Sequence, residues 1–360
     1  MKKTALVCLA FSFFLAGCWD ERLYKEITIV PLIGYERKNE EWMGYFTHTS
    51  IDSENTVSYT TVEGSGVSIE DARLNASQKT SESLDPSQVL AVLLTKEGVS
   101  SNLVETFDVA YRMPRSRLSS KLAVVDGEMA PYMEKTEKMG LEPPNYYDKI
   151  LTTAAYHSII PNIDIQRAAR FILDDGVDLD LPYLKISEMT GTPEVAGVAL
   201  FSSKVFSGHV LDIKESTILQ VLKKKPGKFT VFTYEWENEG VKFPVTVELD
   251  RYKKQWEIQK DKIDATYDVK LDINSFPADH LDEKNRRREL EKFLSKKLTQ
   301  DFNKVMGKLQ EAKSDPIGFG RVVRAFHPEL WNKGDWPETF SQLEIQVKVE
   351  AKITRTGIID

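Results

Sequence analysis

The alternation of apolar and polar residues is clearest near the end of the chain. Along 343–355 (LEIQVKVEAKITR) every second side chain is apolar, and the others are almost all charged or polar. This period of two predicts a strand with one buried face and one wet face. Along 282–313 the apolar residues instead recur at helical spacing, at Leu290, Leu294, Leu298, Phe302, Val305 and Leu309. This stripe predicts a long helix that packs one face on the core.

Shorter patterns fill the first half of the chain. Strands are expected at 27–33, 41–50, 57–62, 88–95 and 118–125. Helices are expected at 68–84, 103–112, 128–138, 147–157 and 165–176. Ser68 with Asp71 forms a capping pattern at the start of the first helix. Gly64-Ser65-Gly66 is interpreted as a turn, and Pro143-Pro144 as a break.

The pattern restarts after Gly191-Thr192-Pro193. A hairpin is expected from 195–201 and 204–210, a helix at 213–222 and an exposed turn at 223–227. Further strands are expected at 228–236, 245–253, 255–260 and 264–274. The fold class is therefore α+β and multi-domain, with mixed or antiparallel sheets each flanked by helices and the long helix packed on a sheet.

The chain has 360 residues, which is longer than a single hydrophobic core ordinarily supports. We divide it into a leader at 1–17, an N-terminal α+β region at 18–192 and a C-terminal α+β domain at 193–360. A subdivision of the middle region near 140–147 stays open.

The amino terminus has the pattern of an export leader. Lys2 and Lys3 precede an uncharged, mostly apolar run at 5–16. As a helix this run would be about 18 Å long, well short of a bilayer core of roughly 30 Å. It ends in Leu15-Ala16-Gly17-Cys18, which resembles the bacterial lipobox. We expect cleavage between Gly17 and Cys18, diacylglycerol on the Cys18 sulfur, and anchoring on the outer face of a membrane.

Composition and charge argue against nucleic-acid binding and against chemistry at a free thiol. The formal charge is −7, and loss of Lys2 and Lys3 with the leader would bring it to about −9. An acidic body of this kind is a poor match for nucleic acid. The only other cysteine is Cys8, in the leader, so the mature chain would have no free thiol.

Motifs for catalysis or metal binding are not found in the sequence. The five histidines lack metal spacing, and there is no HExxH, GxSxG or phosphate-binding glycine loop. The acidic run at 174–180 lacks the layout of a calcium loop and is interpreted as a solvated helix end. We therefore predict no enzyme activity, no cofactor and no metal.

Several short motifs occur in a fixed order along the chain. Their residues are Leu15–Asp20, Gly64–Gly66 with Glu70, Ala72 and Leu74, then Asp108, Arg112 and Arg117, then Gly197–Phe201, and finally Asp315, Gly318 and Gly320 with Trp331. Together they resemble the Ger(x)C family, the lipoprotein C subunits of nutrient germinant receptors in spore-forming bacteria.

The resemblance implies a role in a receptor complex. Such a chain would work with an integral-membrane A subunit and a polytopic B subunit, at the inner spore membrane, to trigger germination. The resemblance supplies no nutrient-binding residues, so direct nutrient binding stays open. Structural or partner-contact roles are expected for Asp108, Arg112, Arg117, Asp315, Gly318, Gly320 and Trp331. For the Asp108/Arg112 pair, a helix-stabilising ion pair is favoured over a buried pair or a partner contact.

Two other classes of protein remain as alternatives. A lipid-anchored solute-binding protein of a transporter would need two lobes around a cleft with convergent polar groups. An envelope hydrolase is disfavoured by the absence of catalytic motifs.

Overall fold

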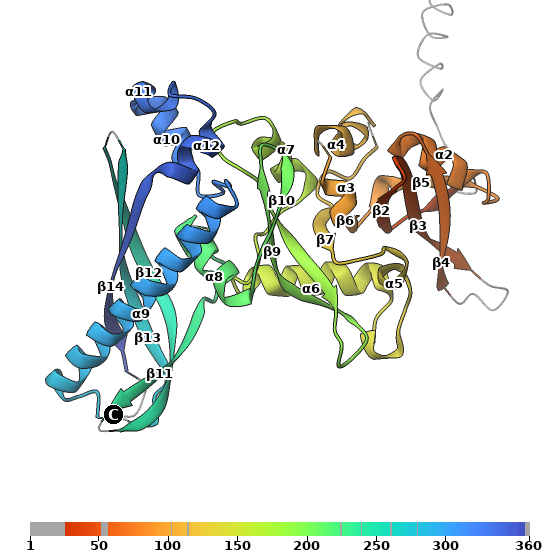
Figure 1. Ribbon diagram of the computed structural model, residues 1–360. Coiled ribbons are helices and arrows are strands. Elements are labelled where there is room, and N and C mark those ends of the chain that lie inside the picture. Colours follow the sequence, from red (N-terminus) through yellow and green to blue (C-terminus); the bar gives the residue numbers. More distant parts are fainter. Residues whose placement is uncertain are drawn as a thin grey trace, which may run out of the picture.

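The computed structural model describes residues 26–51, 57–101, 103–113, 115–223, 225–238, 240–259, 261–278 and 280–356. Within these residues the strands form one eight-stranded sheet, one four-stranded sheet and one two-stranded pair. Figure 1 shows the two larger sheets side by side along an elongated molecule, with a helix, α8 (Ile213–Leu222), between them. The predicted α+β class is confirmed.

The eight-stranded sheet is mixed, with the order β10-β9-β8-β7-β6-β2-β3-β4. Its four central strands run parallel, and antiparallel pairs flank them on both sides. The strands are β2 (Leu32–Lys38), β3 (Glu41–Ile51), β4 (Val57–Gly66), β6 (Ala91–Thr95), β7 (Lys121–Val125), β8 (Asp180–Ile186), β9 (Pro193–Ser202) and β10 (Val205–Leu211). Beside this sheet, β1 (Ile27–Ile29) pairs in parallel with β5 (Ser83–Asp85).

Helices cover both faces of this sheet, which explains why the central strands are mostly apolar. One face packs against α2 (Ile69–Ser77), α4 (Leu103–Arg112) and α7 (Ile165–Ile172). The other packs against α5 (Ala130–Met133) and α6 (Pro143–Tyr156). The remaining short helices are α3 (Lys96–Val99), η2 (Pro86–Gln88) and η3 (Glu137–Met139).

The four-stranded sheet has the order β11-β12-β13-β14, and its last two strands are parallel. Its strands are β11 (Val231–Asn238), β12 (Val241–Ile258), β13 (Lys262–Ser275) and β14 (Glu344–Arg355). The long helix α9 (Lys284–Glu311) lies on one face of the sheet (Figure 1). Both predictions for this region are confirmed, because the apolar stripe of α9 and the apolar face of β14 are buried together. Three short helices connect the two elements: α10 (Phe319–Phe326), α11 (Pro328–Trp331) and α12 (Trp336–Gln342).

A second row of side chains on α9 protects the outer edge of β14. An edge strand presents backbone N–H groups that lack strand partners. Four polar side chains of α9, spaced four residues apart, accept hydrogen bonds from these groups, each at 2.9 Å. The pairs are Glu291 with Ile353, Ser295 with Ala351, Thr299 with Val349 and Asn303 with Val347. The helix α9 therefore contributes its apolar face to the core and covers the outer edge of β14 with its polar row.

Two expectations about turns and helix ends were wrong. The Gly64-Ser65-Gly66 segment continues β4 rather than forming a turn, because α2 packs so closely that a Cβ on Gly64 would lie 2.2 Å from the carbonyl oxygen of Ala72. The helix capped by Ser68 ends at Ser77, and β5 occupies the end of the predicted span.

Several expectations drawn from proline and loop patterns were also wrong. Pro143 does not break a helix but opens α6, where its missing N–H costs nothing. The helix expected at 128–138 is only a four-residue helix, α5, followed by the short η3. The strands expected at 245–253 and 255–260 are one continuous strand, β12.

Strands β9 and β10 follow residue 192, yet they complete the first sheet, because β9 pairs with β8 and β10 pairs with β9. The division expected at residue 192 stays a prediction. In the described part of the chain, no helix combines the length and the apolar composition that crossing a bilayer needs.

Candidate functional site

The Asp315 motif forms a tight loop between α9 and α10. The Asp315 side chain is fully buried and accepts hydrogen bonds on both carboxylate oxygens. Its Oδ1 accepts from the Gly318 N–H at 2.8 Å, and its Oδ2 accepts from the Gly320 N–H at 2.8 Å and from Nε1 of Trp336 at 3.1 Å. A single carboxylate therefore fixes the loop, the start of α10 and the start of α12.

The two glycines of the motif are required by the geometry of this loop. Gly318 has φ of 82°, in the left-handed region that favours glycine. A Cβ on Gly320 would lie 2.5 Å from Nε1 of Trp336 and 2.9 Å from the carbonyl oxygen of Gly176. Trp331 stacks on Trp336, with ring centroids 5.6 Å apart. The structure thus brings Asp315, Gly318, Gly320 and Trp331 together in one loop region.

A second carboxylate ties this loop to the first sheet. Asp178, just before β8, accepts from the Asp315 N–H at 2.8 Å and from the Ser203 N–H at 3.1 Å. The Asp178 N–H in turn donates to the carbonyl oxygen of Asp315 at 3.0 Å. The loop is therefore a joint between the eight-stranded sheet and the α9–α12 region.

Burial governs the ionisation of both carboxyl groups. It raises the pKa of Asp315 to about 7, and the nearby Asp178 adds to the rise, while the N–H groups of Gly320 and Gly318 oppose it. Burial likewise raises the pKa of Asp178 to about 6, against the opposing hydrogen bonds from Asp315 and Ser203. The joint therefore holds two carboxyl groups that titrate near neutral pH.

A cavity of about 300 Å³ opens beside the joint. Acidic and aromatic side chains from both sides of the joint dominate its lining, among them Phe171, Asp174, Asp178, Trp331, Asp335 and Trp336. Asp174 already binds two guanidinium groups, Arg321 at 2.6 Å and Arg324 at 3.0 Å. The described residues contain no group of three or more side chains placed to hold a metal ion. The lining therefore offers carboxyl groups and aromatic rings to a ligand.

The earlier motif, with Asp108, Arg112 and Arg117, lies elsewhere, around α4. Asp108 and Arg112 form an ion pair with a 2.7 Å contact on the helix surface, where the Arg112 side chain is 78% exposed. The interpretation as a buried pair is excluded, and that as a surface helix pair is favoured. A partner contact at this pair stays a prediction.

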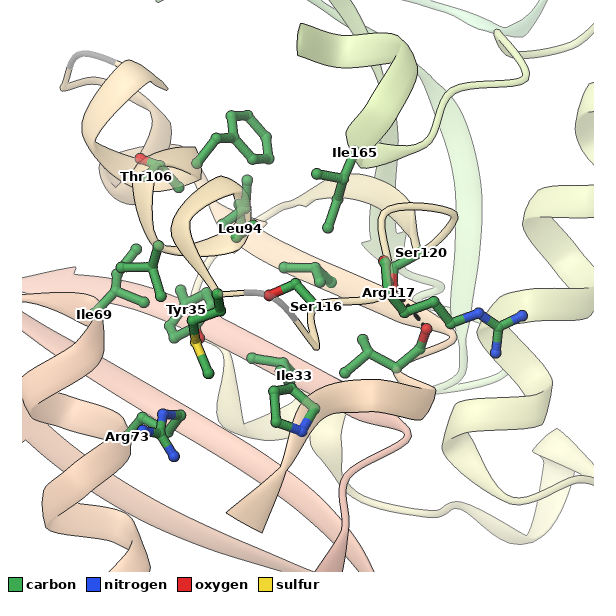
Figure 2. Close-up of a pocket in the computed structure, with 17 residues that line it drawn as sticks. Ile33, Tyr35, Ile69, Arg73, Leu94, Thr106, Ser116, Arg117, Ser120 and Ile165 are labelled. Carbon is green, nitrogen blue, oxygen red and sulfur yellow. Dashed lines mark hydrogen bonds between the residues drawn. The ribbon is translucent and has the colours of Figure 1, made fainter. Parts of the chain in front are cut away.

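Arg117 stands at the rim of a small apolar cavity of about 60 Å³ under α4. Figure 2 shows its guanidinium pointing away from Tyr35, Leu94 and Ile165, which line the interior. The Arg117 Nε donates to Ser119 Oγ at 3.1 Å, and its carbonyl oxygen accepts from the Ser120 hydroxyl at 2.6 Å. These contacts give Arg117 a role in the loop after α4.

The acidic run at 174–180 was misinterpreted as a solvated helix end. Asp180 is buried, with 1% of its side chain exposed, and it pairs with the buried Lys223. Lys223 itself had been assigned to an exposed turn, which is also wrong. The partners of this run come from residues 203, 204, 223, 315, 321 and 324. Because these partners are distant in the sequence, the cluster of aspartates was the only sign of the site that the sequence offered. Trp336 was missed as well. Gly17 and Cys18 lie outside the described residues.

Two family models match consecutive parts of the chain. The model described as "Spore germination protein N-terminal domain" matches residues 20–186, and the model described as "Spore germination B3/ GerAC like, C-terminal" matches residues 196–357. A two-sheet α+β body that carries both domains in this order defines a class of spore germination proteins. The chain belongs to the Ger(x)C (GerAC-like) family of that class, and the resemblance found in the sequence is confirmed.

Individual relatives match along their whole lengths. Spore germination protein GerQC of Bacillus cereus is 22% identical over 365 residues, covering 99% of this chain and 100% of the relative. Spore germination protein B3 of Bacillus subtilis (strain 168) is 25% identical over 385 residues, covering all of both chains. The crystal structure of the GerBC protein shares the fold, with a TM-score of 0.57 and 21% identity, and covers 89% of this chain and 96% of that one.

Proposed function

We propose that this chain is the lipid-anchored, non-enzymatic C subunit of a spore nutrient germinant receptor, and that it acts with integral-membrane A and B subunits to trigger germination. Membership of the Ger(x)C family supports the role in germination. The order of basic start, apolar run and Leu15-Ala16-Gly17-Cys18 supports the lipid anchor. The absence of catalytic motifs from the sequence supports a binding rather than a chemical role.

The lipid anchor can be tested with a pair of cysteine variants. Cys18→Ala removes the sulfur that would carry the lipid, so we expect the chain to leave the membrane fraction of spores and nutrient-triggered germination to weaken. Cys8→Ala, in the apolar run of the leader, is the matched control and should leave both properties unchanged. Membrane fractionation, the intact mass of the mature chain and germination rates would be measured. Full membrane retention and normal germination of Cys18→Ala spores would contradict the proposal.

The partner subunits can be tested by isolating the anchored chain from spore membranes. A receptor subunit should co-purify with integral-membrane proteins, and mass spectrometry would identify them. Recovery of transporter components instead would favour a second candidate function, that of a lipid-anchored solute-binding protein. The cavity of about 300 Å³ at the joint supports this candidate, since such proteins bind solute in a cleft between two lobes.

We also propose a division of the mature chain into residues 18–192 and 193–360. The two family models support it, since one match ends at 186 and the next begins at 196. Because β9 pairs with β8 across this boundary and β10 pairs with β9, the division separates two sequence segments that share one sheet.

A further inference from the structure

A second cavity, of about 320 Å³, lies between α7, the end of α8 and the start of α10. Its lining contains five cationic side chains and not one carboxylate among the described residues. The cations are Arg167 and Arg170 of α7, Lys223 and Lys225 after α8, and Arg321 of α10. Acidic residues outnumber basic ones in this chain, 55 to 48, so this grouping runs against the overall charge.

Only part of this positive charge is neutralised by the protein itself. Three of the five cations have a carboxylate partner outside the lining: Lys223 pairs with Asp180, Arg321 with Asp174 and Arg167 with Asp164. Arg170 and Lys225 form no ion pair with any carboxylate that the structure describes. At least two positive charges at the cavity therefore have no carboxylate within ion-pair distance in the described part of the chain.

The cations are also crowded together. Lys223, Lys225 and Arg321 all surround the ring of Phe171, with their charged groups 5.7, 5.4 and 5.9 Å from its centre. Desolvation lowers the pKa of Lys225, and like-charge repulsion from Lys223, Arg321 and Arg170 lowers it further. The Asp180 carboxylate opposes this lowering only in part. A bound anion would relieve this repulsion.

An unsatisfied polar group points to a missing ligand at the same place. Gln220 lines the cavity and is 1% exposed, yet neither its amide nitrogen nor its amide oxygen has a hydrogen-bond partner among the described residues. Buried amides are nearly always hydrogen-bonded, because leaving them unpaired costs free energy. The amide nitrogen of Gln220 is a neutral donor that could complete the coordination of an anion.

We propose that this cavity binds a small anion that carries two or more negative charges on carboxylate or phosphate groups. Guanidinium groups recognise both kinds of oxyanion through paired hydrogen bonds, which fits Arg170. The charges come from both matched segments of the chain, since α7 lies in the first and α8 and α10 lie in the second. A bound anion would therefore bridge the two segments.

The proposal can be tested by calorimetry on the purified full chain in neutral detergent. Sodium pyrophosphate and trisodium citrate serve as phosphate and carboxylate probes, and glycerol serves as an uncharged control. We expect saturable binding of at least one anionic probe near one-to-one stoichiometry. The double variant Arg170→Gln/Lys225→Gln, which changes two exposed side chains, should weaken the affinity for that anion about tenfold or more. Arg288→Gln/Lys253→Gln, with the same loss of charge at exposed positions of α9 and β12, should change it less than about twofold.

Three results would overturn the proposal. They are no binding of either anion, an equal loss in both double variants, or binding only to vesicles containing phosphatidylglycerol and not to the free anions. The last result would assign the cations to a lipid surface instead. The experiment tests neither the lipid anchor on Cys18 nor the partner subunits, so its failure would leave the proposed receptor role standing.

Discussion

At the residue scale, the Asp315 loop shows how a weak motif in the sequence becomes a rigid joint. Each residue of the motif has a local cause. Gly318 adopts a left-handed backbone, Gly320 makes room for Trp336, and Asp315 accepts hydrogen bonds from the Gly320 N–H and the Trp336 indole. The resemblance identified Asp315 and the glycines, but it could not identify Trp336 or Asp178. Their roles depend on contacts across the fold, and Asp178 lies 137 positions from Asp315.

We expect Gly320→Ala to destabilise the protein by about 1–3 kcal/mol, because its Cβ would press against the Trp336 indole and the Gly176 backbone. Gly307→Ala is the matched control. It lies within α9 with nothing within 4 Å of an added Cβ, so the same change should stabilise by about 0.5–1 kcal/mol. Urea unfolding measures both, and equal effects would contradict the close packing at Gly320.

Asp178 should make stability depend on pH. Its folded pKa of about 6 lies above the unfolded value of about 3.9, so the folded state holds this proton more tightly and stability falls as pH rises through this window. Asp178→Asn removes that titration. Relative to wild type, the variant should therefore gain about 1 kcal/mol in free energy of unfolding between pH 5 and pH 7.5.

The neighbouring Asp175 provides the control for this pH dependence, because its side chain is 74% exposed. Asp175→Asn should follow the wild-type pH profile. Chemical unfolding at the two pH values measures the difference, and parallel profiles for wild type and Asp178→Asn would show that burial does not control this carboxyl group.

At the element scale, periodicity was most informative where one element packs along its full length. The helix α4 and the helix α8 have the expected bounds, and α9 and β14 differ from expectation by only one or two residues at each end. Errors arose where tertiary packing sets the local conformation. The sequence pattern around Gly64 predicted a turn, but Gly64 lies in strand β4, where α2 packs closely against it.

The polar row of α9 was hidden in the same way. Its apolar stripe was evident from the sequence, whereas Thr299 and its neighbours looked like ordinary surface residues. Their role becomes visible only when β14 is placed at the sheet edge with its N–H groups facing the helix.

We expect Thr299→Val to cost about 1–3 kcal/mol of unfolding free energy, because it leaves the Val349 N–H without its acceptor while preserving side-chain volume. Thr153→Val, at an exposed position of α6, is the matched control and should change stability by less than about 0.5 kcal/mol. Urea unfolding compares the two. Slow exchange of the Val349 amide hydrogen in wild type should become faster in Thr299→Val, and unchanged exchange would contradict the edge-cover role.

At the scale of the whole molecule, charged residues join the parts that the apolar pattern builds separately. Asp180 begins β8 in the first matched segment, and Lys223 follows α8 in the second. Sequence reasoning placed both in solvent, because a short run of charges gives no sign of its distant partner. The fold class could be predicted from local periodicity, but the interface between the segments could not.

A double-mutant cycle would test whether this buried pair holds the two segments together. Lys223→Met leaves the Asp180 carboxylate buried without its cation, which should cost about 3–5 kcal/mol. Asp180→Leu combined with Lys223→Met replaces the pair by apolar side chains and should recover most of that loss. The exposed Asp108–Arg112 pair is the control, since Asp108→Leu and Arg112→Met should act independently in water. Strict additivity at Asp180 and Lys223 would instead mean that each side chain finds other partners, and that this pair does not hold the two segments together.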